Sequence, residues 1–247
     1  MYRSVTTDGD RPNGSTSRPL AIVGTDTGVG KTAITAGLTR YYRERGKAAR
    51  AIKPAQTGCP PDDDAAFVAD ACGDPDAAVR LRALEPPLAP RVAAERVGDR
   101  LSYDAILADC ERQVDRAELA LVEGIGGLRV PLAGDREVID LVADLEATAV
   151  VVARSGLGTL NHTALSVAAL ERRGVDVRGI VCNEFDGATV AKRTNPAELE
   201  RMTGRPVETV PSVDADGSPR TLATGVVDAL SPSFLERLSD VDAKSIE

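Results

Sequence analysis

A glycine-rich loop that ends in Lys31 and Thr32 carries the clearest chemical signal in this sequence. Residues 24–32 read GTDTGVGKT, after an apolar segment and before residues with helical spacing, which is the context of a loop that binds nucleotide phosphates. In such loops backbone N–H groups face the phosphate oxygens, the lysine neutralises the β- and γ-phosphates, and the threonine hydroxyl binds Mg²⁺. The loop predicts a nucleotide site, although Thr25 stands where the strict pattern has glycine.

Lys53 and Thr57 form a second candidate site in the segment KPAQTG, residues 53–58. Proline cannot donate to a strand ladder, so Pro54 should end the preceding strand and direct Lys53 outward from the carboxyl edge of the sheet. A lysine and a threonine at that edge suit an anionic reacting group. A surface lysine beside an ordinary turn is the alternative.

Candidate metal ligands occur at two places. Glu123 ends an apolar run and is followed by Gly124, Ile125 and Gly126, the position at which a phosphate-loop enzyme places a second metal contact. Residues 62–64 are three consecutive aspartates, of which a solvated acidic loop would explain at least two. The single histidine, His162, argues against a metal site built from histidines and against a Ser-His-Asp triad.

Two further predicted strand ends have open interpretations. Residues 156–163 (GLGTLNHT) include small residues at the start of a helical pattern. This arrangement suits either a helix N-terminus that binds an anion or an ordinary capped helix. Asn183, in the segment CNE, has the paired donor and acceptor needed to contact a purine edge. A turn-forming asparagine is the alternative for that position.

The elements that must position these residues alternate along the chain. Short apolar runs predict strands at residues 20–24, 48–52, 119–123, 149–153, 179–182 and 207–210. Helical patterns lie at residues 33–45, 102–116, 136–145, 160–173 and 196–203, and residues 222–238 are expected to pack as helices on the sheet's edge. This order predicts a single-domain α/β P-loop fold, with a mostly parallel, doubly wound sheet flanked by helices and ligands at the carboxyl ends of the strands.

Composition narrows the class of protein. With 247 residues, 43% of them hydrophobic, and a net charge of −8, we expect one domain over residues 20–240 and no nucleic-acid partner. Residues 1–19 are expected to be a disordered lead-in and residues 241–247 a flexible tail. No apolar run approaches the roughly 20 residues of a membrane span, and four scattered cysteines predict reduced thiols in a cytoplasmic protein.

Taken together, the motifs resemble the dethiobiotin synthetase family over roughly residues 20–211. The segments that carry the resemblance, in order, are GTDTGVGKT, KPAQTG, PLAPRVAAE, VEGIGGLRVPL, VARSGLGTLNHT, the Asn183 strand end and RTNPAELERMTGRPV. The resemblance implies an ATP- and Mg²⁺-dependent cyclo-ligase of biotin biosynthesis, acting as a homodimer. Its substrates would be 7,8-diaminopelargonate, CO2 and ATP, and its products dethiobiotin, ADP and phosphate.

The resemblance also implies residue roles. It makes Lys53 and Lys31 catalytic, and it assigns Thr32, Asp64 and Glu123 to the metal. It assigns ATP binding to Gly28, Val29, Gly30, Lys31, Thr32, Ala33, Asp64, Glu123, Gly124, Ile125, Gly126, Asn183, Glu184 and Pro211. It assigns the diamine to Thr27 and Thr57 and, from the partner chain, to Gly158, Thr159, Leu160 and Asn161. The choice of Asp64 stays open, because the stretch after Thr57 is short and holds three consecutive aspartates. The preferred nucleotide base also stays open, because a common family glycine before Pro211 is missing.

Three other interpretations share the loop and the sheet. A cobyrinate-type amide ligase would need a glutaminase domain, for which 247 residues leave no room. A non-catalytic nucleotide-binding regulatory module would not need Lys31, Thr32, Lys53 and Glu123 together. The ParA/MinD-like ATPases carry a second lysine where Asp26 stands.

Overall fold

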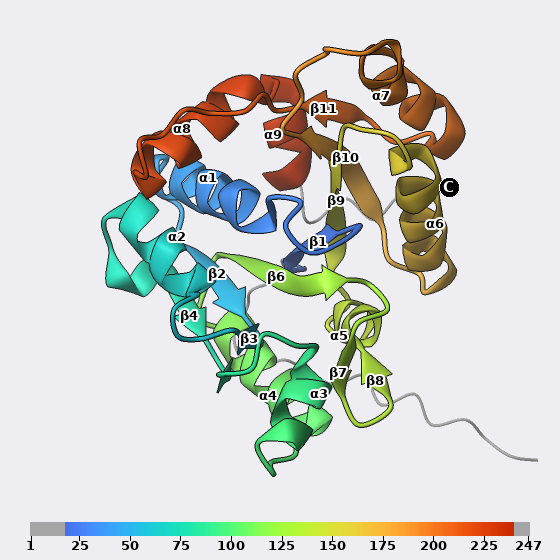
Figure 1. Cartoon of the computed structure of the whole chain (residues 1–247). Helices are drawn as coiled ribbons and strands as arrows, with labels where there is room; N and C mark the ends of the chain where they lie inside the picture. Colours follow the sequence, from blue (N-terminus) through green and yellow to red (C-terminus); the bar gives the residue numbers. More distant parts are fainter. Residues whose placement is uncertain (1–17, 240–247) are drawn as a thin grey trace, which may run out of the picture.

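The computed structural model describes residues 18–239, and a seven-stranded parallel sheet forms its centre (Figure 1). The strand order is β11-β10-β9-β1-β6-β2-β4, and all neighbours pair in parallel. The strands are β1 (Leu20–Gly24), β2 (Ala49–Lys53), β4 (Ala78–Arg80), β6 (Leu119–Gly127), β9 (Thr148–Arg154), β10 (Val177–Asn183) and β11 (Val207–Thr209). Two small sheets pair β3 (Gln56–Thr57) with β5 (Ala83–Leu84) and β7 (Pro131–Ala133) with β8 (Arg136–Glu137).

Helices cover both faces of the main sheet. They are α1 (Lys31–Glu44), α2 (Asp64–Cys72), α3 (Pro90–Arg96), α4 (Tyr103–Val114), α5 (Val138–Asp144), α6 (Thr159–Arg172), α7 (Val190–Thr203), α8 (Pro219–Ala229) and α9 (Pro232–Ser239). Helix α1 lies beside α2 and α8 on one face (Figure 1). The apolar side chains of α4, α5 and α6 pack against the opposite face.

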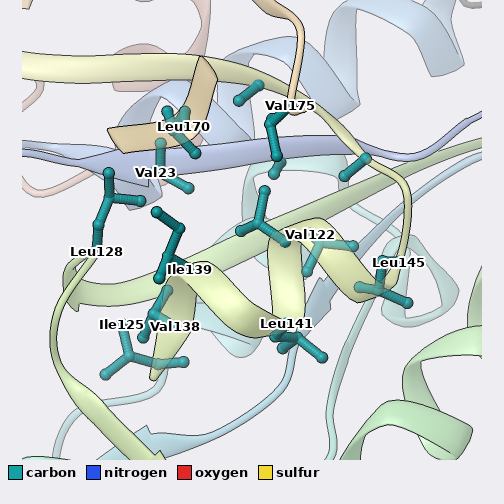
Figure 2. Close-up of a cluster of buried hydrophobic side chains, with 14 of the residues drawn as sticks. Val23, Val122, Ile125, Leu128, Val138, Ile139, Leu141, Leu145, Leu170 and Val175 are labelled. Carbon is teal, nitrogen blue, oxygen red and sulfur yellow. The ribbon is translucent and has the colours of Figure 1, made fainter. Parts of the chain in front are cut away.

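Side chains alternate between the two faces along the buried strands, and in this way they contribute to two hydrophobic cores, one on each face of the main sheet. In β1, Ala21 and Val23 enter the cluster under α4, α5 and α6, while Leu20 and Ile22 enter the cluster under α1, α8 and α9. Successive side chains of a strand point to opposite faces, so a strand buried on both faces is apolar throughout. Figure 2 shows the first cluster, in which Val23 of β1 lies near Ile139 of α5.

Glycine permits the close packing of the C-terminal helix. A Cβ atom at Gly179 of β10 would lie 2.3 Å from Cε2 of Phe234, a ring that is 1% exposed in α9. Any larger side chain at this position would displace the ring or the strand. Gly179 therefore lets α9 seat Phe234 directly on the sheet.

The predicted fold class is confirmed, and the differences lie in the short elements. The sequence patterns predict none of β4, α2 and α3. Helix α7 begins at Val190, six residues before its predicted start, with Thr189 capping it and Pro196 inside it. Residues 222–238, expected to be helical, form α8 and α9 on either side of Leu230.

Three sequence expectations concern the chain ends, the membrane and the cysteines. The proposed lead-in (residues 1–19) and tail (residues 241–247) fall outside the described residues, apart from Arg18 and Pro19. No helix between residues 18 and 239 has the length and apolar character needed to cross a bilayer. Cys59, Cys72, Cys110 and Cys182 are all free thiols in the structure, as expected.

Sheet order explains why distant segments meet. Strands β1, β6 and β2 are consecutive neighbours, with Ile22 opposite Glu123 and Ile52 opposite Val122. Glu123 lies inside β6, which continues to Gly127, whereas the sequence placed it at the strand's end. The loop after β1, Glu123 and Lys53 at the end of β2 therefore share one region of the carboxyl edge.

Candidate active site

The loop between β1 and α1 is shaped by two glycines in left-handed conformations. Gly28 has φ 68° and Gly30 has φ 95°, which glycine adopts without the strain that a Cβ atom causes. Gly30 is also the N-cap of α1, and neither a side-chain cap nor a first-turn acid satisfies this helix start. The first N–H groups of α1 are thus available to an anion, as in phosphate-binding loops.

Lys31 lies inside this loop with 7% of its surface exposed. Its Nζ donates to the backbone oxygen of Asp26 at 2.9 Å. Burial, followed by the positive charge of Lys53, lowers the pKa of Lys31 to about 8. The Lys31 ammonium is therefore poorly compensated, and a nearby phosphate would stabilise its charged form.

Lys53 is the centre of a buried polar cluster at the end of β2. Its Nζ lies 2.8 Å from Oε1 of Glu123 and 2.5 Å from Oδ2 of Asp64. It also donates to the backbone oxygen of Gly124 at 3.3 Å. Burial alone would lower the pKa of Lys53, but the Glu123 and Asp64 carboxylates outweigh burial and raise it above its ordinary value. Lys53 is therefore held as an ammonium ion.

Thr32 joins the two carboxylates from the first turn of α1. Its Oγ1 donates to Oε1 of Glu123 at 2.9 Å. The Thr32 hydroxyl also lies within hydrogen-bonding range of the Asp64 carboxylate. Burial raises the pKa of Asp64, but the charge of Lys53 outweighs it and leaves that pKa below its usual value. The structure thus brings the three predicted metal residues together, with the ammonium of Lys53 between the acids.

This donor set fits Mg²⁺. Hard cations prefer oxygen ligands, and protein-bound Mg²⁺ commonly uses one or two carboxylates together with substrate phosphates and water. Asp64, Glu123 and Thr32 supply two carboxylates and a hydroxyl beside the phosphate loop. Within residues 18–239, no group of three or more His, Cys, Asp or Glu side chains could hold a metal. The set resembles a metal–nucleotide site more than a closed protein cage.

The three aspartates of residues 62–64 have separate environments. Asp63 caps α2 by accepting from the backbone N of Ala66, and it forms an ion pair with Arg80. Asp64 is the first residue of α2 and faces Lys53. Asp62 is exposed at the rim of the cleft. The structure therefore places Asp64 at the cluster and gives Asp63 a structural role.

A cleft of about 980 Å³ extends from this cluster. Most of the predicted site residues line it: Thr27, Gly28, Gly30, Lys31, Thr32, Ala33, Lys53, Thr57, Asp64, Glu123, Ile125, Gly126 and Glu184. Val29 is buried below the loop, and Gly124 contributes its backbone oxygen to Lys53.

The three residues predicted to contact the base differ in their burial and in their position relative to the cleft. Asn183 is 8% exposed, and its Nδ2 donates to the backbone oxygen of Val29 at 3.1 Å. A Cβ atom at Gly30 would lie 2.0 Å from the same Nδ2. Glu184 is exposed with φ 52° and borders the cleft. Pro211 is exposed and lies outside the lining.

The predicted carboxylate-binding segment lies apart from the cleft. This segment forms the N-cap and first residues of α6, after β9, and does not line the cleft. Its residues are Gly158, Thr159, Leu160 and Asn161. Gly158 is the N-cap, with φ 86° and no side-chain cap. Within one chain, the structure does not bring this segment to Lys53.

Sequence reasoning missed several side chains around the cleft. Gln56 is 6% exposed and bonds to the backbone of Asp64 and Thr57. Arg154 lies outside the phosphate loop and donates to the backbone oxygen of Thr27 at 3.1 Å. Further residues that line the cleft and were not predicted are Phe67, Pro87, Leu88, Pro219 and Leu222. A polar residue two positions after Pro54 and an arginine ending an apolar strand were the available signals for Gln56 and Arg154.

Solved structures share this fold. The cell division ATPase MinD of Pyrococcus furiosus matches with a TM-score of 0.56 and 17% identity, covering 90% of this chain and 97% of that one. A ParA family ATPase from Chlorobium tepidum matches with a TM-score of 0.57 and 13% identity, covering 92% and 98%. At these identities the similarity shows the architecture alone.

Sequence relatives are more specific. A family model described as an AAA domain matches residues 18–214. The ATP-dependent dethiobiotin synthetase BioD of Haloferax mediterranei is 54% identical over 228 residues, which cover 92% of this chain and 97% of that protein. The BioD protein of Aquifex aeolicus is 34% identical over 216 residues, covering 87% and 98%. With such identity over nearly its whole length and with this site geometry, the chain belongs to the dethiobiotin synthetase family.

Proposed function

We propose that this chain forms dethiobiotin, ADP and phosphate from 7,8-diaminopelargonate, CO2 and ATP, as an ATP-dependent cyclo-ligase of biotin biosynthesis. The observation that carries the proposal is the cluster of Lys53, Asp64, Glu123 and Thr32 beside an uncapped phosphate loop in one cleft. Residues 20–240 would form the synthetase domain, working in the cytoplasm.

The reaction has three bond-forming steps. One amine of the substrate adds to CO2 and loses a proton, giving a carbamate. A carbamate oxygen attacks the γ-phosphorus of ATP, the bond to ADP breaks, and a mixed carbamic-phosphoric anhydride forms. The second amine then attacks the carbamoyl carbon and loses a proton, which closes the ureido ring, and the bond to phosphate breaks to release it. Because negative charge develops on oxygen atoms during these steps, the protein mainly positions the reactants and neutralises charge.

The cations of the cleft suit these steps. The N–H groups of α1 and the Lys31 ammonium would hold the β- and γ-phosphates. Lys53 would stabilise the carbamate and the phosphoryl group in transfer, since its two carboxylate partners keep it protonated. Thr32, Asp64 and Glu123 would hold Mg²⁺, which supplies further neutralisation of phosphate charge. Thr27 and Thr57, both at the cleft, would contact the diamine. Asn183, Glu184 and Pro211 would frame the base.

We further propose a homodimer in which residues 158–161 of one chain bind the substrate carboxylate held by the other. The uncapped start of α6 suits a carboxylate, and its position outside the cleft of its own chain is consistent with delivery to the cleft of a second chain. Leu157 is 93% exposed and Leu165 is 63% exposed on this part of the surface. An isologous pairing that covers them would build two identical sites.

The proposed reaction is tested by measuring ADP release with bicarbonate present, with and without diaminopelargonate. ADP release should depend on the diamine and match dethiobiotin formation one for one. A cobyrinate-type ligase would instead require an amide donor and another acid substrate. A regulatory module would bind ATP without diamine-dependent turnover. Either of these two results would contradict the proposed function.

Lys53→Gln should reduce turnover by about 100-fold while leaving ATP affinity within about threefold, because it removes a donor aimed at developing charge. Steady-state kinetics and calorimetric ATP titration measure the two effects. Lys47→Gln is the matched control, because Lys47 is an exposed lysine paired with Glu118 away from the cleft. Equal turnover in the two variants would remove Lys53 from the mechanism.

Activity should disappear with a chelator and return with added Mg²⁺, and Asp64→Asn should raise the Mg²⁺ concentration for half-maximal activity by about 10-fold or more. Asp62→Asn should change it little, because Asp62 is exposed at the rim. Asp63→Asn keeps a helix-capping oxygen and tests the Arg80 ion pair separately. Greater sensitivity at Asp62 or Asp63 would reassign the metal carboxylate.

The shared site is tested by mixing two variants, each of which impairs a different part of the site. Gly158→Leu should raise the KM for the diamine but spare ATP affinity, since the substitution alters the start of α6. In a mixed dimer with Lys53→Gln, one of the two sites has both its lysine and its loop intact. Random exchange at equal amounts should therefore restore about a quarter of wild-type activity. Light scattering and a subunit-exchange assay confirm mixing; exchanged dimers without recovered activity would exclude the shared site.

A further inference from the structure

Gln56 is a buried polar side chain that the proposed chemistry does not use. It lies on β3, three residues after Lys53, and only 6% of its surface is exposed. Its backbone N donates to the oxygen of Arg82 at 2.9 Å, which fixes β3 against the β5 segment. A glutamine with so little contact with solvent needs partners inside the protein.

Both ends of the Gln56 amide have partners that belong to the proposed site. Its Oε1 accepts from the backbone N of Asp64 at 3.3 Å. Its Nε2 donates to the backbone oxygen of Thr57 at 3.1 Å. One side chain therefore connects a proposed metal ligand with a proposed diamine contact.

The contact with Asp64 has a definite physical consequence. Asp64 is the first residue of α2, and the first N–H groups of a helix have no partner within the helix. By accepting from that N–H, Gln56 fixes where α2 begins relative to β2 and β3. The Asp64 carboxylate then lies 2.5 Å from Nζ of Lys53.

A second set of contacts, made by Arg80 and Asp63, also holds the start of α2. Arg80, at the end of β4, pairs with the Asp63 carboxylate and donates to Sγ of Cys59 at 3.2 Å. Asp63 in turn caps Ala66. These contacts hold the loop before α2 but do not reach the backbone of Asp64. Gln56 thus holds the backbone of the proposed metal ligand, whose carboxylate pairs with Lys53.

We infer that Gln56 is a positioning residue that sets Asp64 for metal binding and Thr57 for the diamine. This inference rests on the proposed function for the roles of those two residues. It predicts that the two contacts can be separated by substitution. Gln56→Met keeps the length of the side chain and loses both hydrogen bonds. Gln56→Glu keeps an acceptor for the Asp64 N–H but cannot donate to the Thr57 oxygen.

The first measurement is Mn²⁺ binding to the full chain in the presence of a non-hydrolysable ATP analogue, followed by electron paramagnetic resonance. Gln56→Met should weaken Mn²⁺ binding by about 10-fold, as removal of a hydrogen bond that orients a ligand does elsewhere. Gln113→Met is the matched control, because the same change on α4 lies outside the cleft and removes a buried oxygen that has no hydrogen-bond partner among residues 18–239. Gln56→Glu should bind Mn²⁺ within about threefold of wild type.

The second measurement separates the two substrates. Gln56→Glu should raise the KM for the diamine by about 10-fold, with a smaller change in the KM for ATP, because the Thr57 oxygen then faces a carboxylate instead of a donor. This variant also tests the inference if Gln56→Met fails to fold.

Three results would overturn the inference: Mn²⁺ affinity in Gln56→Met equal to that in Gln113→Met, Mn²⁺ affinity lost in Gln56→Glu, or a diamine KM unchanged in Gln56→Glu. Failure of the proposed function is distinguishable from these results. Wild-type protein that binds Mn²⁺ with the ATP analogue but forms no dethiobiotin would reject the reaction, while the Mn²⁺ comparison still decides the role of Gln56 toward Asp64.

Discussion

The buried ammonium of Lys53 is the group on which the arrangement of the cleft depends. A charge removed from water is strongly destabilising unless opposite charges and hydrogen bonds replace its hydration. Glu123, Asp64 and the Gly124 oxygen supply that replacement. These partners come from β6 and α2, so the cluster forms only when β2 lies next to β6 and α2 starts beside β3. The strand order is therefore a requirement of the chemistry as well as of the hydrophobic core.

The two lysines of the cleft have opposite pKa shifts because their partners differ. Lys53 faces two carboxylates and keeps its proton. Lys31 is bonded to a backbone oxygen, is desolvated, and is repelled by Lys53. Lys31 is thus the cation that gains most from an added anion, and it lies where the N–H groups of α1 point. On electrostatic grounds, a phosphate group is therefore more stable at the phosphate loop than beside the carboxylates of Asp64 and Glu123.

The predictable parts of the structure are those with a strong local pattern. β1 and the central residues of β9 and β10 are buried on both faces and therefore read as short apolar runs. β4 has three residues, all half-buried, and α2 buries only Ala65, Val68 and Ala71. Such short elements give little periodic signal, because their position is set by packing against α1 and β2. The Asp63–Arg80 pair could not be foreseen for the same reason, since Arg80 ends a strand that had not been predicted.

Asn183 shows how a residue type can suggest chemistry that its surroundings restrict. An asparagine amide offers a donor and an acceptor, which favoured contact with a base edge. In the structure one of the two amide N–H donors is used within the protein, since Nδ2 donates to the Val29 oxygen and packs over Gly30. The side-chain oxygen and the second N–H then remain to meet a base. Asn183 therefore acts first as a brace between β10 and the phosphate loop, and the absence of a side chain at Gly30 is what makes room for that brace.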